Sequence, residues 1–156
     1  SIGAEVIGKN IDPLGNTLII NRGARDGLKV GQPAIVSGGI LIGKIIKTAD
    51  ATAVIRLIND NQSKVAATVI NKDKSLGLIE GGYGISVYLN YIPQNELVAV
   101  NDLVVTSGLE EDLPKGLLIG PVVVVEKEAY QPFQKAVISP LVDLNKILLV
   151  SIITQL

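Results

Sequence analysis

The residues best suited to do chemistry lie together in the segment VVTSGLEEDLPKGLLIGPV, which runs from Val104 to Val122. Ser107 offers a hydroxyl group, and Lys115 follows it within the same predicted loop. Three consecutive carboxylates occupy positions 110–112. These residue types raise two possibilities, which are hydrolysis through an activated serine and binding of a hard cation by carboxylate oxygens.

The composition removes most ways of activating that serine. The chain of 156 residues contains no Cys and no His. This excludes a triad with His as the base, a thiol nucleophile, a disulfide, and a zinc site built on Cys or His. A Ser-Lys dyad would need a desolvated Lys115, whereas the loop pattern places this lysine in solvent. We therefore expect Ser107 to be a turn residue that hydrogen-bonds its own backbone, and keep a hydrolase as the less favoured alternative.

The acidic residues Glu110, Glu111 and Asp112 are consecutive, whereas Ca²⁺ loops usually alternate their ligands. We interpret them as a solvated loop tip. Paired carboxylates for glycoside hydrolysis would need an aromatic cleft, but the chain has only four Tyr and one Phe. The sequence therefore predicts no catalytic residue, no metal and no cofactor.

The charges argue against nucleic acid as a partner. Fourteen basic and 15 acidic residues give a net charge of −1, and no Lys- or Arg-rich run is present. A phosphate-binding surface needs clustered cations. The longest charge-free run, residues 81–95, is too short and too polar for a spanning helix, which needs about 20 apolar residues. The chain has no Met, so we expect Ser1 to be a cut site or a fragment boundary.

The elements that must position the loop are β-strands. Apolar residues come in short runs rich in Val, Ile and Thr, such as TLIIN (17–21) and AVIRLI (53–58). Gly, Asn, Asp and Pro separate these runs, which is typical of strands joined by turns. No long segment has a helical period. The sequence therefore predicts an all-β protein.

The chain also repeats itself, which predicts an internal duplication. LKVGQPAIVSGG (28–39) resembles VAVNDLVVTSGL (98–109) at an offset of 70. Before this stretch, residues 15–21 match residues 84–90 at an offset of 69, and residues 6–8 loosely match residues 78–81. After it, residues 41–43 match residues 118–120 at an offset of 77, and residues 53–55 match residues 136–138 at an offset of 83. Asp60 matches Asp143 at an offset of 83, and residues 64–65 match residues 146–147 at an offset of 82. One unit of about six strands therefore occurs twice.

We expect each unit to close into a barrel, because closure removes exposed sheet edges. The predicted architecture is two packed six-stranded antiparallel barrels, residues 1–72 and 73–156, with the boundary near the polar connector NKDKS (71–75). The repeat leaves open whether the terminal strands are exchanged between the barrels. This layout resembles that of chymotrypsin-like proteases, without their catalytic residues. Residues 107–117 are then the lengthened turn of a hairpin that is tight in the first unit, at 37–40.

The few aromatic residues cluster in the second unit. Tyr83, Tyr88 and Tyr91 lie within nine residues of one another, and Tyr130 and Phe133 flank Pro132. Tyr88 alternates with Val87 and Leu89, so it should point away from the barrel interior. Tyr is favoured in protein interfaces. Two interpretations stay open, namely aromatic residues that cover barrel ends and a surface for a partner.

The sequence resembles one family, the rod shape-determining protein MreC, along nearly the whole chain. The resemblance is carried by NRGARDGLKVGQPAIVSGGILIGKI (21–45), AVIRLINDNQSKVAATV (53–69), GLIEG (77–81), LNYIPQN (89–95) and VNDLVVTSGLEEDLPKGLLIGPV (100–122). Their order and spacing agree with the family pattern. Asn59, Gln62, Asn101 and Pro121 are small departures from it.

This resemblance implies a non-catalytic scaffold of the cell-elongation machinery that organises peptidoglycan synthesis. The expected partners are a class B penicillin-binding protein, MreD, RodA and MreB, together with self-association into a homodimer or larger assembly. The expected location is the extracytoplasmic side of the bacterial cytoplasmic membrane, reached through an N-terminal anchor and coiled coil that precede this region. A self-assembling structural module without a penicillin-binding partner is the alternative.

For partner contact we expect apolar and Tyr-bearing barrel surface and hairpin tips. The candidate residues are Tyr88, Tyr91, Ile92, Leu109, Leu113 and Tyr130.

Overall fold

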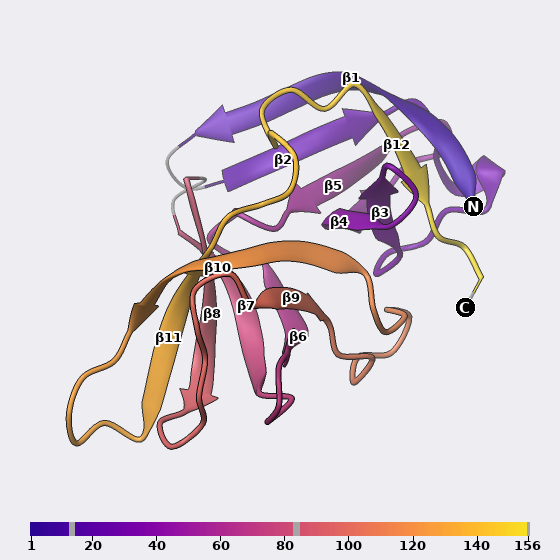
Figure 1. Cartoon of the computed structure of the whole chain (residues 1–156). Coiled ribbons are helices and arrows are strands. Elements are labelled where there is room, and N and C mark those ends of the chain that lie inside the picture. Colours follow the sequence, from indigo (N-terminus) through magenta and orange to yellow (C-terminus); the bar gives the residue numbers. More distant parts are fainter. Residues whose placement is uncertain (13–14, 83–84, 156) are drawn as a thin grey trace.

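The computed structural model describes residues 1–12, 15–82 and 85–155, and this part of the chain is built from strands. It contains twelve strands and the short 3₁₀ helix η1 (Ala24–Asp26). The strands are β1 (Ile2–Asp12), β2 (Gly15–Ile20), β3 (Pro33–Val36), β4 (Ile40–Thr48), β5 (Ala53–Leu57), β6 (Lys64–Ile70), β7 (Leu76–Gly82), β8 (Ser86–Pro93), β9 (Leu103–Thr106), β10 (Leu118–Glu126), β11 (Phe133–Ile138) and β12 (Leu149–Ile152). The predicted all-β class is confirmed (Figure 1).

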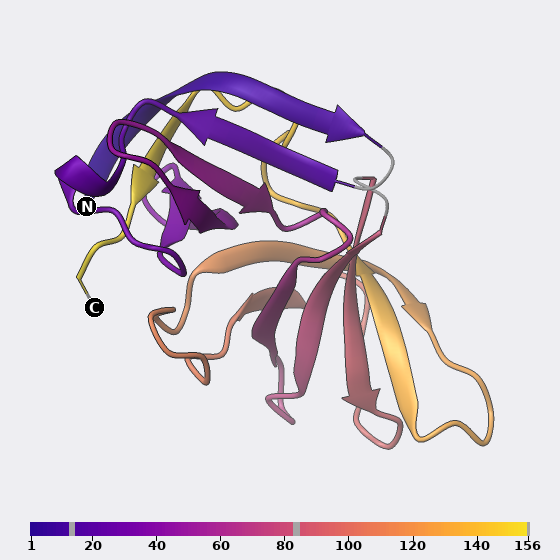
Figure 2. The same ribbon diagram turned by 180° about the vertical axis from the view of Figure 1, so that it is seen from behind.

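Hydrogen bonding joins the strands into two closed antiparallel rings. Ring 1 runs β1-β2-β5-β4-β3-β12 and returns to β1, while ring 2 runs β6-β7-β8-β11-β10-β9 and returns to β6. A single parallel pairing, between Ile40 of β4 and Leu118 of β10, connects them. Ring 1 forms the upper tier of Figure 1 and ring 2 the lower tier, and the view from behind in Figure 2 shows the same arrangement. Closure satisfies strand edges that open sheets of this size would expose.

The pairing does not follow the expected division at residue 72. β6 precedes that position but pairs with β7 and β9 of ring 2. β12 lies near the C-terminus but pairs with β1 and β3 of ring 1. The chain crosses from ring 1 to ring 2 through residues 58–63 and returns through residues 139–148. Each ring is thus closed by a strand that the simple division assigned to the other unit.

The two rings share strand order and register at residues that the repeat aligns. Leu18 lies opposite Ile55 in ring 1, and Val87 lies opposite Ile138 in ring 2. Both rings also have a bulge at the same place in β4 and β10. Further matched pairs are Ala34 with Gly43 and Val104 with Gly120, and Ile45 with Ile55 and Val122 with Ile138.

Alternation along the strands fills both rings with aliphatic side chains. In β8, Val87 and Leu89 are buried while Tyr88 between them is only partly covered, as the period-two pattern predicts. The largest fully buried side chains are all aliphatic: Leu18, Ile20, Leu41, Ile42, Ile45, Ile55, Leu57, Ile58, Ile79, Leu89, Ile92 and Ile119. The aromatic side chains that the structure describes, Tyr88, Tyr91, Tyr130 and Phe133, are all partly or fully exposed.

Candidate partner-binding surface

Ring 2 has one end against ring 1 and one end free. At the free end β6, β8 and β10 finish and β7, β9 and β11 begin, so the loops 71–75, 94–102 and 127–132 all lie there. These loops form the bottom of Figure 1. We call this region the distal end of ring 2.

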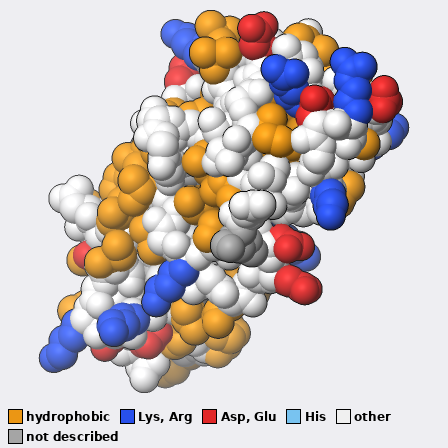
Figure 3. Space-filling view, turned by 90° about the vertical axis from the view of Figure 1, so that its right-hand side faces the viewer, with side chains coloured by type: hydrophobic (Ala, Val, Ile, Leu, Met, Phe, Trp, Pro, Cys, Tyr) orange, Lys and Arg blue, Asp and Glu red, His pale blue; other side chains and the backbone are white. Residues whose placement is uncertain are grey.

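The distal end of ring 2 carries a concentration of exposed apolar side chains. Tyr130 is fully exposed, and Leu97 is 76% exposed. The set comprises Ile70, Leu76, Tyr91, Leu97, Val100, Tyr130 and Phe133, which we call the distal apolar surface. Figure 3 shows hydrophobic side chains gathered on the lower part of the molecule, with Lys and Arg beside them. Grouped exposed apolar side chains of this kind mark binding surfaces.

A bulge in β8 brings Tyr91 to this surface. Between the pairs Leu89–Ala136 and Ile92–Gln134, β8 has two residues where β11 has one. The extra residue shifts the alternation, so Tyr91 turns outward and Ile92 is buried at 0% exposure. Tyr91 has a φ of 63°, which is uncommon for a bulky residue. Strain of this kind persists where the surroundings hold it, and it clusters at binding sites.

Tyr91 packs against Phe133 on the neighbouring strand. Their ring centroids are 5.8 Å apart and the rings are almost perpendicular, at 89°. This edge-to-face geometry is a favourable aromatic arrangement. Both rings are nonetheless about half exposed, so the pair forms an apolar wall that is open to solvent.

Polar groups adjoin the aromatic pair. Lys135 Nζ lies 3.3 Å from Glu126 Oε2 and 5.3 Å from the centre of the Tyr88 ring. Tyr88, one of the predicted residues, thus lies on the outer face of β8 beneath a lysine and at the side of the distal apolar surface.

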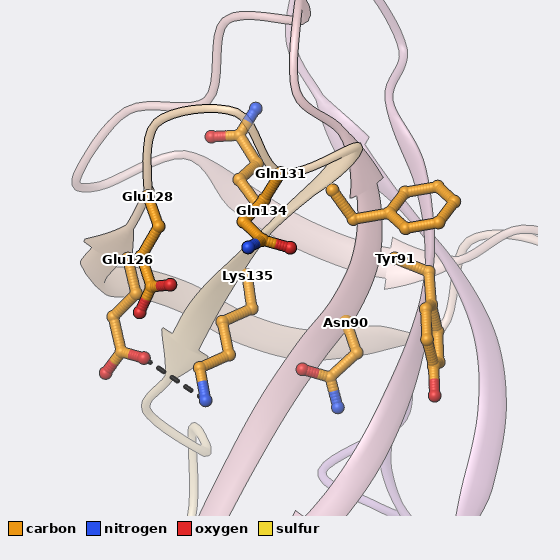
Figure 4. A pocket seen from close by; sticks show the side chains of 8 residues that line it. Asn90, Tyr91, Glu126, Glu128, Gln131, Gln134 and Lys135 are labelled. Carbon is orange, nitrogen blue, oxygen red and sulfur yellow. Dashed lines mark ion pairs between the residues drawn. The ribbon is translucent and has the colours of Figure 1, made fainter.

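A pocket of about 440 Å³ opens between these groups. In Figure 4, Tyr91 stands on one side, Glu126 and Glu128 stand on the other, and Gln134 lies between them. Gln134 is buried at 3% exposure. The lining residues are Asn90, Tyr91, Glu126, Glu128, Gln131, Phe133, Gln134 and Lys135.

The predicted loop 107–117 lies at the opposite end of ring 2. Ser107 is a turn residue there, because its Oγ accepts a hydrogen bond from the Leu109 amide at 3.3 Å. Thr106 Oγ1 donates to Pro114 O at 2.7 Å and accepts from the Leu117 amide at 2.9 Å, which closes the loop across its base. This matches the expected lengthened hairpin turn.

Glu110 is not part of a solvated tip. Its carboxylate accepts hydrogen bonds from Lys44 Nζ at 3.1 Å and from the Ala66 amide at 3.0 Å. Lys44 belongs to ring 1 and Ala66 to ring 2, so Glu110 ties the two rings together. Glu111 and Asp112 are exposed, as expected. Within the described parts of the chain no group of three or more Asp or Glu side chains is arranged to hold a metal ion.

The six predicted partner-binding residues therefore fall into three places. Tyr91 and Tyr130 belong to the distal apolar surface, with Tyr88 beside it. Leu109 is 71% exposed but lies on the loop at the other end of ring 2. Ile92 and Leu113 are buried, at 0% and 3% exposure, so neither can touch a partner in this conformation. Tyr83 lies outside the described residues.

Sequence reasoning missed Ile70, Leu76, Leu97 and Val100, and it placed Phe133 in the aromatic cluster without naming it as a candidate contact residue. The repeat held a usable signal for Leu97 and Phe133, because the aligned positions in the first unit are Gly27 and Asp50. An apolar residue in a loop position whose counterpart in the first unit is a glycine or an acid is a sign of exposed apolar surface. Among residues 1–12, 15–82 and 85–155, no helix is long and apolar enough to cross a bilayer.

Comparisons with known proteins agree with this architecture. Residues 6–154 match the family described as rod shape-determining protein MreC, barrel core. The cell shape-determining protein MreC of Listeria monocytogenes is 30% identical over 153 residues, which are 94% of this chain and 52% of that protein. The chain thus spans about half the length of this relative.

Solved structures have the same fold. A structure of MreC from Listeria monocytogenes superposes with a TM-score of 0.87 at 29% identity, covering 97% of this chain and 73% of that one. A structure described as a complex between penicillin-binding protein PBP2 and MreC from Helicobacter pylori matches with a TM-score of 0.75 at 16% identity, covering 97% of this chain and 96% of that one. With its family pattern matched over residues 6–154 and its two strand rings in place, the chain belongs to the MreC family of rod shape-determining proteins.

Proposed function

We propose that this chain is the barrel region of a non-catalytic cell-shape scaffold that binds a class B penicillin-binding protein outside the cytoplasm. The observation that carries the proposal is the distal apolar surface, where aromatic and aliphatic side chains are exposed together on a free barrel end. Interfaces are anchored by such aromatic residues in their centres. Three of the predicted residues, Tyr88, Tyr91 and Tyr130, lie on or beside this surface.

Family membership supports the choice of partner. Relatives of this chain are cell shape-determining proteins, and an MreC from Helicobacter pylori with the same fold is found in complex with PBP2. By the family resemblance, MreD, RodA and MreB are further proposed partners, and an N-terminal membrane anchor is proposed to hold the barrels on the extracytoplasmic side.

The mechanism we propose is differential binding. A scaffold that fits the active form of an enzyme better than its inactive form shifts the population toward the active form without doing chemistry itself. The size of the shift is limited by the difference between the two affinities. A rigid, closed ring suits this role, because its surface need not be ordered on binding.

The test is calorimetry of this chain with the soluble part of the matching class B penicillin-binding protein. Tyr91→Ala should weaken binding at least about tenfold, since it removes a central aromatic anchor. Leu109→Ala is the matched control, because Leu109 is also exposed but lies at the other end of ring 2. Equal weakening by both substitutions, or saturable binding that Tyr91→Ala leaves unchanged, would contradict docking on the distal apolar surface.

A second function, self-assembly, is favoured by a different patch on ring 1. Ile7, Leu148 and Leu149 are each more than half exposed. They are neighbours, since the Val6 amide donates to Leu148 O and Leu149 pairs with Glu5. Sedimentation at rising concentration tests this alternative: Leu148→Glu should lower the average mass of any assembly, and an unchanged mass would remove this patch from consideration.

We also propose that the two rings descend from one duplicated unit whose last strand is exchanged. The shared strand order, registers and bulges support this interpretation. The domains would then be residues 1–58 with 149–154, and residues 64–138. A fragment of residues 64–138 should unfold cooperatively, whereas residues 73–156 should not, because they lack β6 and leave the edges of β7 and β9 unpaired.

A further inference from the structure

The pocket at the distal end of ring 2 offers hydrogen-bond acceptors to a ligand, although its lining includes amide side chains that can also donate. The side-chain amide of Gln134 uses its N–H donors within the protein, because Nε2 donates to Pro93 O at 3.0 Å and to Glu96 O at 2.6 Å. Asn90 does the same, donating Nδ2 to Glu80 Oε1 at 2.9 Å. Neither amide oxygen accepts a hydrogen bond from any described residue. The two amides therefore present acceptors to a ligand and keep their donors for the fold.

The charged residues of the pocket add to this excess of acceptors. Glu126 is paired with Lys135, whose ammonium group also lies over the Tyr88 ring. Glu128 forms no ion pair with any residue that the structure describes. Two carboxylates and one ammonium leave the lining with a net charge of −1. Since carboxylates accept hydrogen bonds and donate none, the pocket favours a cation that only donates.

The aromatic wall narrows the choice of cation. Tyr91, which stands opposite the carboxylates in Figure 4, forms an exposed edge-to-face pair with Phe133. A planar guanidinium group stacks on aromatic faces, is weakly hydrated, and carries five N–H donors. Its aliphatic stem can lie along apolar surface while its head reaches polar groups. An ammonium group has three donors around one point and does not match acceptors spread over several sides of a pocket.

We propose that this pocket receives an arginine side chain of the docked partner. The inference rests on the proposed function, because it names the chemistry by which a protein bound to the distal apolar surface is recognised. The guanidinium group lies between Glu126, Glu128 and the Gln134 amide oxygen, and its stem lies against Tyr91. Charge and hydrogen-bond complementarity then fix the orientation of a partner that the aliphatic part of the surface holds less specifically.

The test is a titration of the ¹⁵N-labelled chain with N-acetyl-arginine amide, followed by NMR. We expect saturable shifts of the Tyr91, Gln134 and Lys135 amides. N-acetyl-citrulline amide is the neutral, nearly isosteric control, and it should bind at least about threefold more weakly because its ureido group lacks the charge and replaces two N–H donors with a carbonyl acceptor. Equal binding of the two compounds, or no shift at these residues up to about 50 mM, would overturn the proposal.

Two substitutions distinguish binding in the pocket from a general effect of the protein's negative charge. Glu128→Gln should weaken binding of the arginine compound about threefold, while Glu111→Gln, the same change on an exposed acid at the other end of ring 2, should not. The same variants in calorimetry with the penicillin-binding protein distinguish the two proposals. Binding that needs Tyr91 but not Glu128 retains the proposed function and overturns the arginine pocket. Arginine binding without any binding of the penicillin-binding protein overturns the proposed partner and retains only the preference of the pocket for an arginine side chain.

Discussion

The corresponding ends of the two rings share several backbone hydrogen bonds but carry different side chains. In ring 1 the Gly31 amide donates to Ile45 O at 2.8 Å, and in ring 2 the Asn101 amide, 70 residues later, donates to Val122 O at 2.8 Å. Both donors have a positive φ, 96° and 77°. Lys29 and Ala99 also make equivalent contacts, each donating its amide to the side chain three residues ahead.

The side chains on these equivalent frames differ in kind. At the corresponding end of ring 1, which includes residues 21–32 and 49–52, Arg25 lies 3.9 Å from Asp50 and Arg22 lies 3.8 Å from Asp26. The offsets of the repeat place Tyr91 at the position of Arg22 and Phe133 at that of Asp50. One end is therefore closed by exposed ion pairs, which contribute little binding energy, and the other presents an aromatic pair. The two rings share a fold, whereas their functions depend on the side chains that each ring presents at its surface.

If the two rings share one backbone arrangement, adding a Cβ at an aligned, closely packed glycine should lower the free energy of unfolding equally in both rings. Gly43 and Gly120 are aligned, and a Cβ would lie 2.2 Å from Arg56 O at the first and 1.9 Å from Ser139 O at the second. Gly43→Ala and Gly120→Ala should each lower the free energy of unfolding by about 3 kcal/mol or more, because backbone must move. Urea denaturation measures both. Gly39→Ala, where the Cβ meets open space, is the control, and a large cost in one ring only would break the comparison.

The two segments that connect the rings, residues 58–63 and 139–148, each contain an aspartate in an equivalent turn, but the two aspartates differ in burial. Asp60 and Asp143 make the same turn, each accepting a hydrogen bond from the amide two residues ahead. Asp60 is buried, also accepts from the Asn16 amide at 2.6 Å, and lies 3.4 Å from Arg56 Nε, whereas Asp143 is exposed.

Asp60→Ala should therefore cost about 2–3 kcal/mol in the free energy of unfolding, because it leaves the buried Asn16 amide without its acceptor and the partly buried Arg56 guanidinium without its carboxylate. Asp143→Ala should cost about 0.5–1 kcal/mol, the contribution of one exposed turn hydrogen bond. Urea denaturation of the two variants gives the difference. Equal costs would mean that the crossing from ring 1 to ring 2 is no more rigid than the return.

The sequence allowed the strands and the outward direction of Tyr88 to be predicted, because these depend on local alternation and turn residues. It left open which ring β6 and β12 close, since aligned strands fit either ring equally well. Tyr91 and Ile92 were both expected at the surface, but Ile92 is buried because of a bulge that has no clear residue signature. Glu110 was assigned to solvent because its partner Lys44 is 66 residues away, and no local pattern predicts such a contact.

The aromatic pair should contribute more to binding than to stability. Tyr91→Ala removes the edge-to-face contact with Phe133 and a half-buried ring, so unfolding should become easier by about 1 kcal/mol. Arg22→Ala at the aligned position should change stability by less than about 0.5 kcal/mol, because an exposed ion pair is lost. Thermal unfolding of both variants provides the comparison. A larger loss for Arg22→Ala would mean that the ion pairs, rather than the aromatic pair, hold their end together.

The smallest expected effect comes from making the two frames more alike. Asn101 occupies a left-handed conformation with a φ of 77°, where the aligned residue of ring 1 is Gly31. A non-glycine residue pays a steric cost in this region, and asparagine pays less than most. Asn101→Gly should therefore stabilise the chain by a few tenths of a kcal/mol up to about 0.5 kcal/mol, with part of the gain lost to the greater freedom of glycine in the unfolded chain. The converse change, Gly31→Asn, should destabilise by a similar amount, since a Cβ at Gly31 meets no atom within 4 Å and only the backbone conformation opposes it. Differential scanning calorimetry of the two variants measures both effects. Shifts of Tm in opposite directions mean that both rings impose the same backbone geometry at this position. Shifts of the same sign mean that the loops around Val100 and Val30 differ in ways that their hydrogen bonds do not reveal.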